Sequence, residues 1–272
     1  MLQRRFGPLE VDVPVIGLGT WQMEADDRDS AILAIRRAID LGMTHVDTAE
    51  LYGRGAVEDI VGEALAGYRA EVFLASKVHP DQATYAGTLR ACEKSLRRLR
   101  TDRLDLYLLH WRGSQPLEET FRAFEVLKQD GKILAWGVSN FDVSDLEHAI
   151  DIAGEGAIAC NQVLYNLHER DPDHVLQVFC ERHRIAFVGY SPLGSGQFPR
   201  PGGVEGDTLA RIASARGVTA RAVALAYLTR RSGAFTIPKS SSLAHVEELA
   251  RAGDLVLDRD EIAEIEAAFP LA

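Results

Sequence analysis

The chain has 272 residues, of which 46% are hydrophobic and 26% charged, and its formal net charge at pH 7 is −10. This composition is typical of a globular protein with a large core, and the negative charge argues against nucleic acid or an anionic membrane as its main partner. Residues 1–13 ("MLQRRFGPLEVDV") lack the apolar core of a signal peptide, and no apolar run approaches the length of about 18 residues that a transmembrane helix needs, so we expect a cytoplasmic protein.

Eight short apolar runs alternate with helix-like segments. A β-hairpin over residues 2–13, with its turn at Gly7-Pro8, is expected first. The strands that follow are predicted over residues 15–18, 44–46, 72–76, 104–109, 133–138, 158–163, 186–189 and 234–237. The helices between and after them are predicted over residues 28–41, 57–65, 84–99, 116–130, 144–153, 172–183, 207–216 and 242–250.

Eight strand–helix units favour a closed α/β fold, the (β/α)8 TIM barrel. The strands are almost entirely apolar, as expected of parallel strands that are buried on both faces. A doubly wound open sheet is the alternative, but it usually needs fewer units and a Gly-rich first turn, which this sequence lacks. We therefore predict one barrel domain over residues 1–272, with the N-terminal hairpin as a cap and two extra helices over residues 221–228 and 259–268.

Polar side chains close seven of the eight predicted strands. In a barrel of this kind the carboxyl ends of the strands carry the chemistry, so these side chains should share one rim. A single lysine or histidine at such a position has ordinary structural explanations, such as a salt bridge or a place in the core. The convergence of seven strands is harder to explain by packing: Asp47 and Tyr52; Lys77; His110; Ser139 and Asn140; Asn161 and Gln162; Tyr190 and Ser191; Lys239 and Ser240.

Four of these residues suggest acid catalysis toward a carbonyl group. A tyrosine has an ordinary pKa of about 10, and a nearby ammonium lowers the pKa of the phenol. Lys77 is placed to supply that charge, with Asp47 as its partner, so Tyr52 becomes a candidate general acid. His110 is placed to orient the carbonyl or share its proton. The set has no obvious protein nucleophile, and a hydride from a cofactor would fill that role.

The remaining rim residues suggest a dinucleotide. Ser139, Asn140 and Gln162 offer groups that bracket a carboxamide, and Tyr190 offers a ring for stacking. Lys239 and the following serines, at the start of a helix, suit a phosphate. Simple N-capping of the helix explains the serines equally well.

The sequence contains eight short motifs: "GLGTW" (17–21), "DTAELYG" (47–53), "SK" (76–77), "LLHW" (108–111), "GVSN" (137–140), "NQ" (161–162), "YSPLGSG" (190–196) and "IPKSSSLAHVEEL" (237–249). They occur in the order found in the aldo-keto reductase family, which the chain resembles over nearly its whole length. The resemblance implies a (β/α)8 barrel and an NADPH-dependent reduction of aldehydes or ketones to alcohols.

The resemblance also implies a role for each matching residue. Tyr52 would be the proton donor, Lys77 would lower its pKa, Asp47 would pair with Lys77, and His110 would orient the substrate. Trp21 and Trp111 would join Tyr52 and His110 as pocket walls. Cofactor contacts are implied for Gly19, Thr20, Asp47, Ser139, Asn140, Gln162, Tyr190, Ser191, Leu193, Ser195, Lys239, Ser240 and His245.

Two positions depart from the family pattern. His245 stands where members usually carry an arginine that grips the 2′-phosphate, and Leu249 stands where an asparagine is frequent. A bidentate arginine is not replaced without loss. We still expect NADPH, because Lys239 and the serines remain, but with weaker discrimination against NADH. The loop after His110 and the C-terminal segment are short, so we expect an open pocket.

Two other functions compete with carbonyl reduction. One is a cofactor-binding regulatory subunit of a membrane channel or complex with little or no turnover, which the presence of all four catalytic residues disfavours. The other is a lyase or aldolase in which Lys77 forms a Schiff base, which requires an unpaired lysine. Three widely spaced cysteines without CxxC spacing predict neither a disulfide framework nor a zinc site. A monomer or small homo-oligomer that acts on a small-molecule aldehyde or ketone is expected.

Overall fold

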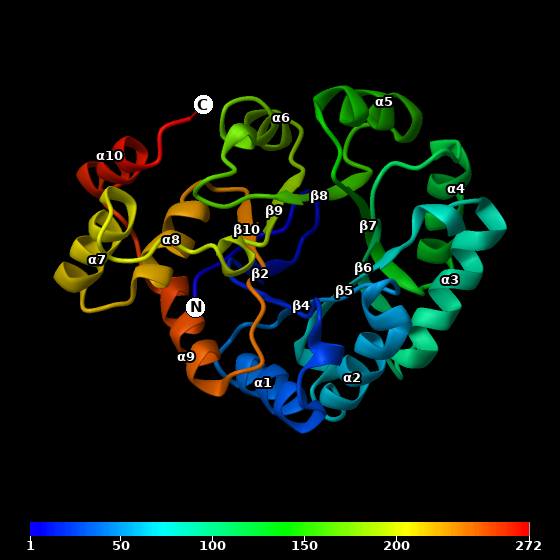
Figure 1. Cartoon of the computed structure of the whole chain (residues 1–272). Helices are drawn as coiled ribbons and strands as arrows, with labels where there is room; N and C mark the ends of the chain where they lie inside the picture. Colours follow the sequence, from blue (N-terminus) through cyan, green and yellow to red (C-terminus); the bar gives the residue numbers. More distant parts are fainter. Residues whose placement is uncertain (272) are drawn as a thin grey trace.

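The computed structural model describes residues 1–271 as a ring of eight parallel strands surrounded by helices (Figure 1). Hydrogen-bonded bridges from Ile16 to Thr236 and from Gly19 to Lys239 join the last strand to the first. The predicted barrel is therefore confirmed. Its strands are β3 (Leu18–Gly19), β4 (His45–Asp47), β5 (Phe73–Val78), β6 (Leu104–Leu109), β7 (Ile133–Ser139), β8 (Ile158–Leu164), β9 (Ala186–Tyr190) and β10 (Ala234–Thr236).

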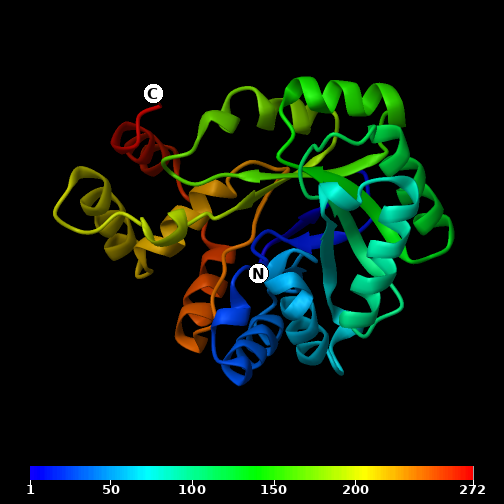
Figure 2. The same ribbon diagram turned by 45° about the vertical axis from the view of Figure 1, so that its right-hand side comes forward.

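The helices form an outer layer around the ring of strands (Figures 1 and 2). The two extra helices are α8 and α10, and α10 lies beside α7 outside the ring (Figure 1). The helices are α1 (Arg28–Asp40), α2 (Ala56–Ala64), α3 (Tyr85–Arg98), α4 (Leu117–Gln129), α5 (Val143–Ala153), α6 (Leu176–Arg182), α7 (Val204–Arg216), α8 (Ala220–Leu228), α9 (Leu243–Arg251) and α10 (Arg259–Ala268).

Three boundaries differ from the prediction by three residues or more. The first strand was expected over residues 15–18, but only its end, at Leu18, belongs to β3, because the backbone of Val15 and Gly17 bonds to Thr236 of β10 instead. Helix α6 begins four residues late, because buried Asp173 is held inward in a preceding 3-10 turn. Helix α7 begins three residues early, because Gly203 adopts an extended N-cap conformation before it.

The predicted hairpin is present and lies at the amino-terminal end of the barrel. Strands β1 (Gln3–Arg5) and β2 (Asp12–Pro14) pair antiparallel. Gly7 has a φ of +56°, and a Cβ there would lie 2.2 Å from the carbonyl oxygen of Ala159, so only glycine fits this close approach. Phe6 packs between Phe73 and Phe235, with ring centroids 4.9 and 5.0 Å away. This end of the barrel is thus closed, and the carboxyl ends of the strands form the open mouth.

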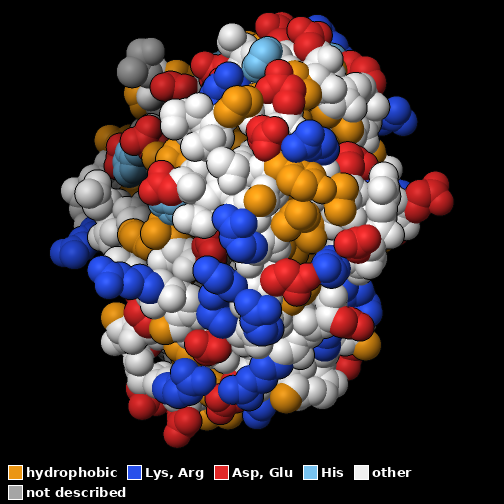
Figure 3. Space-filling view, turned by 90° about the vertical axis from the view of Figure 1, so that its right-hand side faces the viewer, with side chains coloured by type: hydrophobic (Ala, Val, Ile, Leu, Met, Phe, Trp, Pro, Cys, Tyr) orange, Lys and Arg blue, Asp and Glu red, His pale blue; other side chains and the backbone are white. Residues whose placement is uncertain are grey.

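The surface seen in Figure 3 carries basic and acidic side chains side by side, with a small apolar patch among them. No helix within residues 1–271 combines the length and the apolar character that crossing a bilayer requires. The core lies in two places, inside the barrel and between the strands and the helices, where Trp136 stacks on Phe121 at 4.7 Å. This rigid frame fixes the side chains at the mouth of the barrel.

Candidate active site

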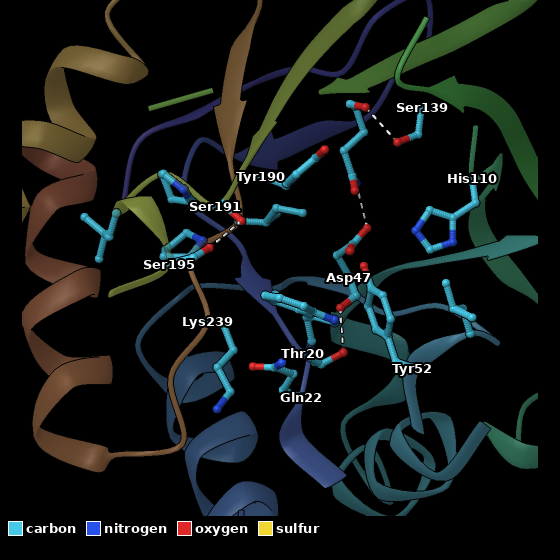
Figure 4. A pocket seen from close by; sticks show the side chains of 18 of the residues that line it. Thr20, Gln22, Asp47, Tyr52, His110, Ser139, Tyr190, Ser191, Ser195 and Lys239 are labelled. Carbon is cyan, nitrogen blue, oxygen red and sulfur yellow. Dashed lines mark hydrogen bonds between the residues drawn. The ribbon is translucent and has the colours of Figure 1, made fainter. Parts of the chain in front are cut away.

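A cavity of about 720 Å³ opens at the mouth of the barrel (Figure 4). Most of the predicted site residues line it, but Lys77, Asn161, Ser240 and His245 do not. Lys77 reaches Tyr52 from behind the lining, and Asn161 Nδ2 donates to the Phe141 carbonyl oxygen instead. The lining residues are Gly19, Thr20, Trp21, Gln22, Asp47, Leu51, Tyr52, His110, Trp111, Ser139, Asn140, Gln162, Tyr190, Ser191, Pro192, Leu193, Ser195, Gly196, Ile237, Pro238 and Lys239.

The loop after β4 brings Tyr52 over the cavity. Strand β4 ends at buried Asp47, and a 3-10 turn over Tyr52–Gly55 leads into α2. Gly53, Arg54 and Gly55 have φ values of 54°, 54° and 96°, so three successive residues are left-handed. Glycine adopts this conformation without strain, which explains the glycines on either side of Arg54. The tight turn holds the Tyr52 ring at the edge of the barrel.

Asp47, Lys77 and Tyr52 form one chain of polar contacts. The Lys77 ammonium is fully buried and donates to Asp47 Oδ1 at 2.5 Å, to the Thr48 carbonyl oxygen at 3.0 Å and to Tyr52 Oη at 3.3 Å. The second Asp47 oxygen accepts from Gln162 Nε2 at 2.8 Å. Each buried charge therefore has a partner, which is what makes a buried ion pair tolerable. The predicted pairing of Asp47 with Lys77 is confirmed by this geometry.

The ion pair of Lys77 argues against a Schiff-base role in this arrangement. Burial alone would lower the pKa of Lys77, but the facing Asp47 carboxylate and the Tyr52 phenol outweigh burial and hold that pKa above its ordinary value. A lysine that attacks a carbonyl must be neutral, and a paired ammonium is not nucleophilic. The geometry thus disfavours the lyase alternative.

Tyr52 differs from the expectation in one respect. Burial raises the pKa of Tyr52, and the neighbouring Lys77 ammonium lowers it without cancelling the effect of burial. Lys77 therefore acts in the predicted direction, but the net shift is upward. The phenol remains protonated at neutral pH, which is the form that a proton donor requires.

His110 lies beside Tyr52 as a neutral imidazole. The two ring centroids are 5.8 Å apart in an edge-to-face arrangement, and the centroid of the Trp111 ring is 4.9 Å from that of His110. Burial and the positive charge of Lys77 lower the pKa of His110 to about 3. Its Nδ1 atom is buried without a hydrogen-bond partner among the described residues. A neutral imidazole here can donate one hydrogen bond into the cavity while adding no charge.

A network of hydrogen bonds joins the residues predicted to hold a carboxamide. The Tyr190 hydroxyl donates to Asn140 Oδ1 at 2.9 Å, and Asn140 Nδ2 donates to the His110 carbonyl oxygen at 3.1 Å. Ser139 Oγ donates to the Gln162 carbonyl oxygen at 2.7 Å. Because the Gln162 side chain also bonds Asp47, the amide residues and the catalytic candidates form one connected set (Figure 4).

The loop after β9 supplies hydroxyl groups along the cavity. Ser191 and Ser195 are left-handed, with φ values of 50° and 49°, and Ser195 Oγ donates to Ser191 Oγ at 3.2 Å. Leu193 lies between them in the cavity wall. At the opposite wall, the buried Thr20 hydroxyl donates to the Asp47 carbonyl oxygen at 2.8 Å. These groups line the path from Tyr52 toward Lys239.

The far end of the cavity differs from the expected phosphate site. Lys239 Nζ and Ser241 Oγ both donate to one oxygen of Asp26. The Ser240 hydroxyl accepts from the Ser242 backbone N–H at 3.1 Å. Ser242 is the N-cap residue of α9, but its side chain makes no capping bond, so N-capping does not explain the whole serine run.

The two residues that depart from the family pattern have different environments. His245 is exposed in the first turn of α9, outside the cavity. Leu249 is buried, one turn further along the same helix, and belongs to the hydrophobic core. Leu249 therefore packs α9 against the core, whereas the His245 side chain faces solvent.

Sequence reasoning missed Leu51 and Gln22, which line the cavity, and Asp26, which engages Lys239. Leu51 is exposed beside Tyr52, and only its place next to the catalytic tyrosine would have pointed to it. Asp26 lies among the acidic residues that precede α1, where a helix N-terminus explains acidic residues without any other role.

Comparison with known proteins agrees with this geometry. The sequence model of the Aldo/keto reductase family matches residues 15–269. The methylglyoxal reductase YeaE of Escherichia coli is 42% identical over 96% of this chain and 93% of its own, and the glyoxal reductase of Bacillus subtilis is 35% identical over 94% and 89%. An aldo-keto reductase from Klebsiella pneumoniae, solved in complex with NADPH, superposes with a TM-score of 0.92 at 43% identity over 100% of this chain and 97% of that one. The chain is a member of the aldo/keto reductase family.

Proposed function

We propose that this oxidoreductase reduces small aldehydes and ketones to alcohols with NADPH, and that Tyr52 is the proton donor. The observation that carries the proposal is the buried chain from Asp47 through Lys77 to Tyr52, which reaches the cavity beside neutral His110. Its relatives include proteins named for methylglyoxal and glyoxal reduction, and an enzyme solved with NADPH, which supports the same chemistry.

The four residues divide the work of proton transfer. The Tyr52 hydroxyl and the His110 imidazole both hydrogen-bond the substrate carbonyl oxygen, which polarises the carbon and fixes its orientation. A bound nicotinamide supplies the hydride that the carbonyl carbon accepts. The Tyr52 proton moves to the carbonyl oxygen, which completes the alcohol, and the resulting phenolate lies 3.3 Å from the Lys77 ammonium. Asp47 holds that ammonium in place, and a proton from solvent restores the phenol.

The donor groups of the cavity suit a nicotinamide dinucleotide. Amide and hydroxyl groups of Ser139, Asn140 and Gln162 would hold the carboxamide, and the Tyr190 ring would stack on the nicotinamide. Further along the cavity Gly19, Thr20, Ser191, Leu193 and Ser195 would contact the pyrophosphate and ribose. At its end Lys239 would meet the 2′-phosphate, joined by Ser240 and His245 from outside the cavity. The volume of the cavity and its connected polar network support this placement.

The substrate side of the cavity is apolar and open. Trp21 is 49% exposed and Leu51 43%, so they and Trp111 form a wall that a small carbonyl compound reaches from solvent. We include 2-oxoaldehydes among the substrates because two relatives carry such names. The proposal also includes a cytoplasmic location, which the three buried, unbonded cysteines suit, and a monomer or small homo-oligomer, which light scattering would measure.

A panel of aldehydes and ketones, assayed by the absorbance of NADPH and in parallel NADH, tests the proposal. Tyr52→Phe should lower kcat by about 10²- to 10⁴-fold, the usual contribution of a general acid, while the Kd for NADPH measured by tryptophan fluorescence stays within about twofold. Wild-type turnover with no loss in Tyr52→Phe would refute the assignment of the acid. Binding of NADPH without turnover of any carbonyl would favour the regulatory-subunit alternative.

A further inference from the structure

Asp26 occupies a position that the proposed reaction does not use. It follows the short 3-10 turn Met23–Ala25, two residues before α1. One carboxylate oxygen accepts from Lys239 Nζ and from Ser241 Oγ, so it joins the loop after β3 to the loop after β10. In Figure 4 the labelled Lys239 lies at the end of the cavity opposite His110. Asp26 thus lies at the end where the 2′-phosphate is expected.

The carboxylate is charged and engages the principal cation of that end. Burial raises the pKa of Asp26, but hydrogen bonds from Lys239 and Ser241 outweigh burial and hold the pKa below its ordinary value. Lys239 and Asp26 are each about one third exposed, so a ligand in solution reaches both. Of the three residues assigned to the phosphate, Lys239, Ser240 and His245, only Lys239 is a lysine or arginine.

We propose that Asp26 sets the cofactor preference of this enzyme: its carboxylate competes with the 2′-phosphate of NADPH for Lys239 and Ser241 and accepts a hydrogen bond from the ribose hydroxyl of NADH. This rests on the proposed function. A phosphate that approaches Lys239 must displace the Asp26 carboxylate or lie beside it, and like charges at such distances repel. A ribose hydroxyl carries no charge and meets a hydrogen-bond acceptor there instead, as acidic residues do in other dinucleotide sites. Asp26 therefore reduces the preference for NADPH over NADH.

Two nucleotides that lack nicotinamide test this without catalysis. They are 2′,5′-ADP and 5′-AMP, which differ only by the 2′-phosphate, and their Kd values are measured by isothermal titration calorimetry. Asp26→Asn removes the charge and keeps the shape. It should lower the Kd for 2′,5′-ADP by about 5- to 30-fold, the range for removing one like charge from a partly exposed site. The Kd for 5′-AMP should stay unchanged or rise slightly. Asp29→Asn, which removes a charge from an exposed residue in the first turn of α1, is the matched control and should change neither Kd by more than about twofold.

A second background shows whether Asp26 acts through Lys239. Lys239→Met should weaken the binding of 2′,5′-ADP. In this background, adding Asp26→Asn should improve that binding far less than it does in the wild type, because the cation that Asp26 pairs with is absent. If Asp26→Asn weakened both nucleotides equally, the pair would be closing the nucleotide site rather than selecting between ligands, and the proposal would be wrong. Should Asp26→Asn fail to fold, judged by circular dichroism, Asp26→Ser takes its place.

Steady-state kinetics separates this proposal from the proposed function. The ratio of kcat/KM with NADPH to kcat/KM with NADH should rise in Asp26→Asn by the factor by which 2′,5′-ADP tightens. An enzyme that reduces carbonyls with an unchanged ratio in Asp26→Asn would refute the role of Asp26 and leave the reductase assignment intact. Absence of turnover with either cofactor would refute the reductase assignment itself.

Discussion

The buried pair of Asp47 and Lys77 gives the most demanding prediction, because it separates charge pairing from shape. The two groups are 2.5 Å apart and both are buried. Removing one partner of such a pair leaves an uncompensated charge, which typically costs about 3–5 kcal/mol. Some compensation remains on each side: Gln162 still bonds Asp47, and the Thr48 carbonyl oxygen still accepts from Lys77. We therefore expect Asp47→Asn and Lys77→Met each to lower the free energy of unfolding by about 3 kcal/mol.

The double variant should be at least as stable as either single one. With both charges gone, no ion remains in the interior, and neutral replacements of similar volume are usually tolerated. The two single losses would then sum to about 6 kcal/mol, whereas the double variant should lose no more than about 3, so the coupling energy is at least about 3 kcal/mol. Urea unfolding followed by tryptophan fluorescence measures all four proteins. All three variants should be almost inactive, so stability and activity separate.

A surface pair provides the matched control. Arg28 Nη2 and Glu63 Oε2 are 2.8 Å apart, a distance close to that of the buried pair, but the two side chains are 47% and 40% exposed. The same cycle there should give a coupling energy below about 1 kcal/mol, because solvent screens the interaction. Additive losses at Asp47 and Lys77, or a coupling no larger than that of the surface pair, would refute the account of the buried site.

Two further predictions concern pH and the amide network. Burial lowers the pKa of His45 from its ordinary value of 6.5 to about 4. Between these two pH values the unfolded chain is protonated at His45 and the folded protein is not. The free energy of unfolding therefore has its full value above pH 6.5 and decreases as the pH falls toward 4. Between pH 7 and pH 5 the wild type should lose about 2 kcal/mol more unfolding free energy than His45→Gln, and parallel urea curves at the two pH values would contradict this. Tyr190→Phe removes the hydroxyl that donates to Asn140 while keeping the ring, so the Kd for NADPH, titrated by fluorescence, should rise about 2- to 10-fold; an unchanged Kd would show that the hydroxyl does not position Asn140.

The sequence was sufficient to predict the barrel fold because the spacing of apolar residues indicates which parts of the chain are buried. Seven of the eight apolar runs were followed by a polar residue at the point where the strand leaves the core, and this local signal predicted the places of Asp47, Lys77 and His110. The fit was poorest at the first strand, where the backbone of Val15 bonds to the last strand of the barrel. The residues around the first strand do not indicate that it pairs with the last one.

What sequence reasoning missed depends on contacts between distant loops. Asp26 and Lys239 are 213 residues apart, and no pattern in either loop indicates the other. The net pKa shift of Tyr52 was also beyond reach, because it depends on how deeply the ring is buried rather than on which residues surround it. The late start of α6 is similar, since Asp173 is held by Tyr165 and Arg230 from other elements.

The closure of the ring has a consequence for how the protein is made. A ribosome delivers the strands in their order around the barrel, so the growing sheet keeps two unpaired edges until residues 234–239 have emerged. The seam then forms through two short bridges, one of which joins Gly19 to Lys239. The proposed nucleotide-binding loop therefore exists only in the completed ring. A nucleotide that binds Lys239 would stabilise the closed ring relative to the open one. The fraction of newly made chain that stays closed would then increase with the concentration of the cofactor.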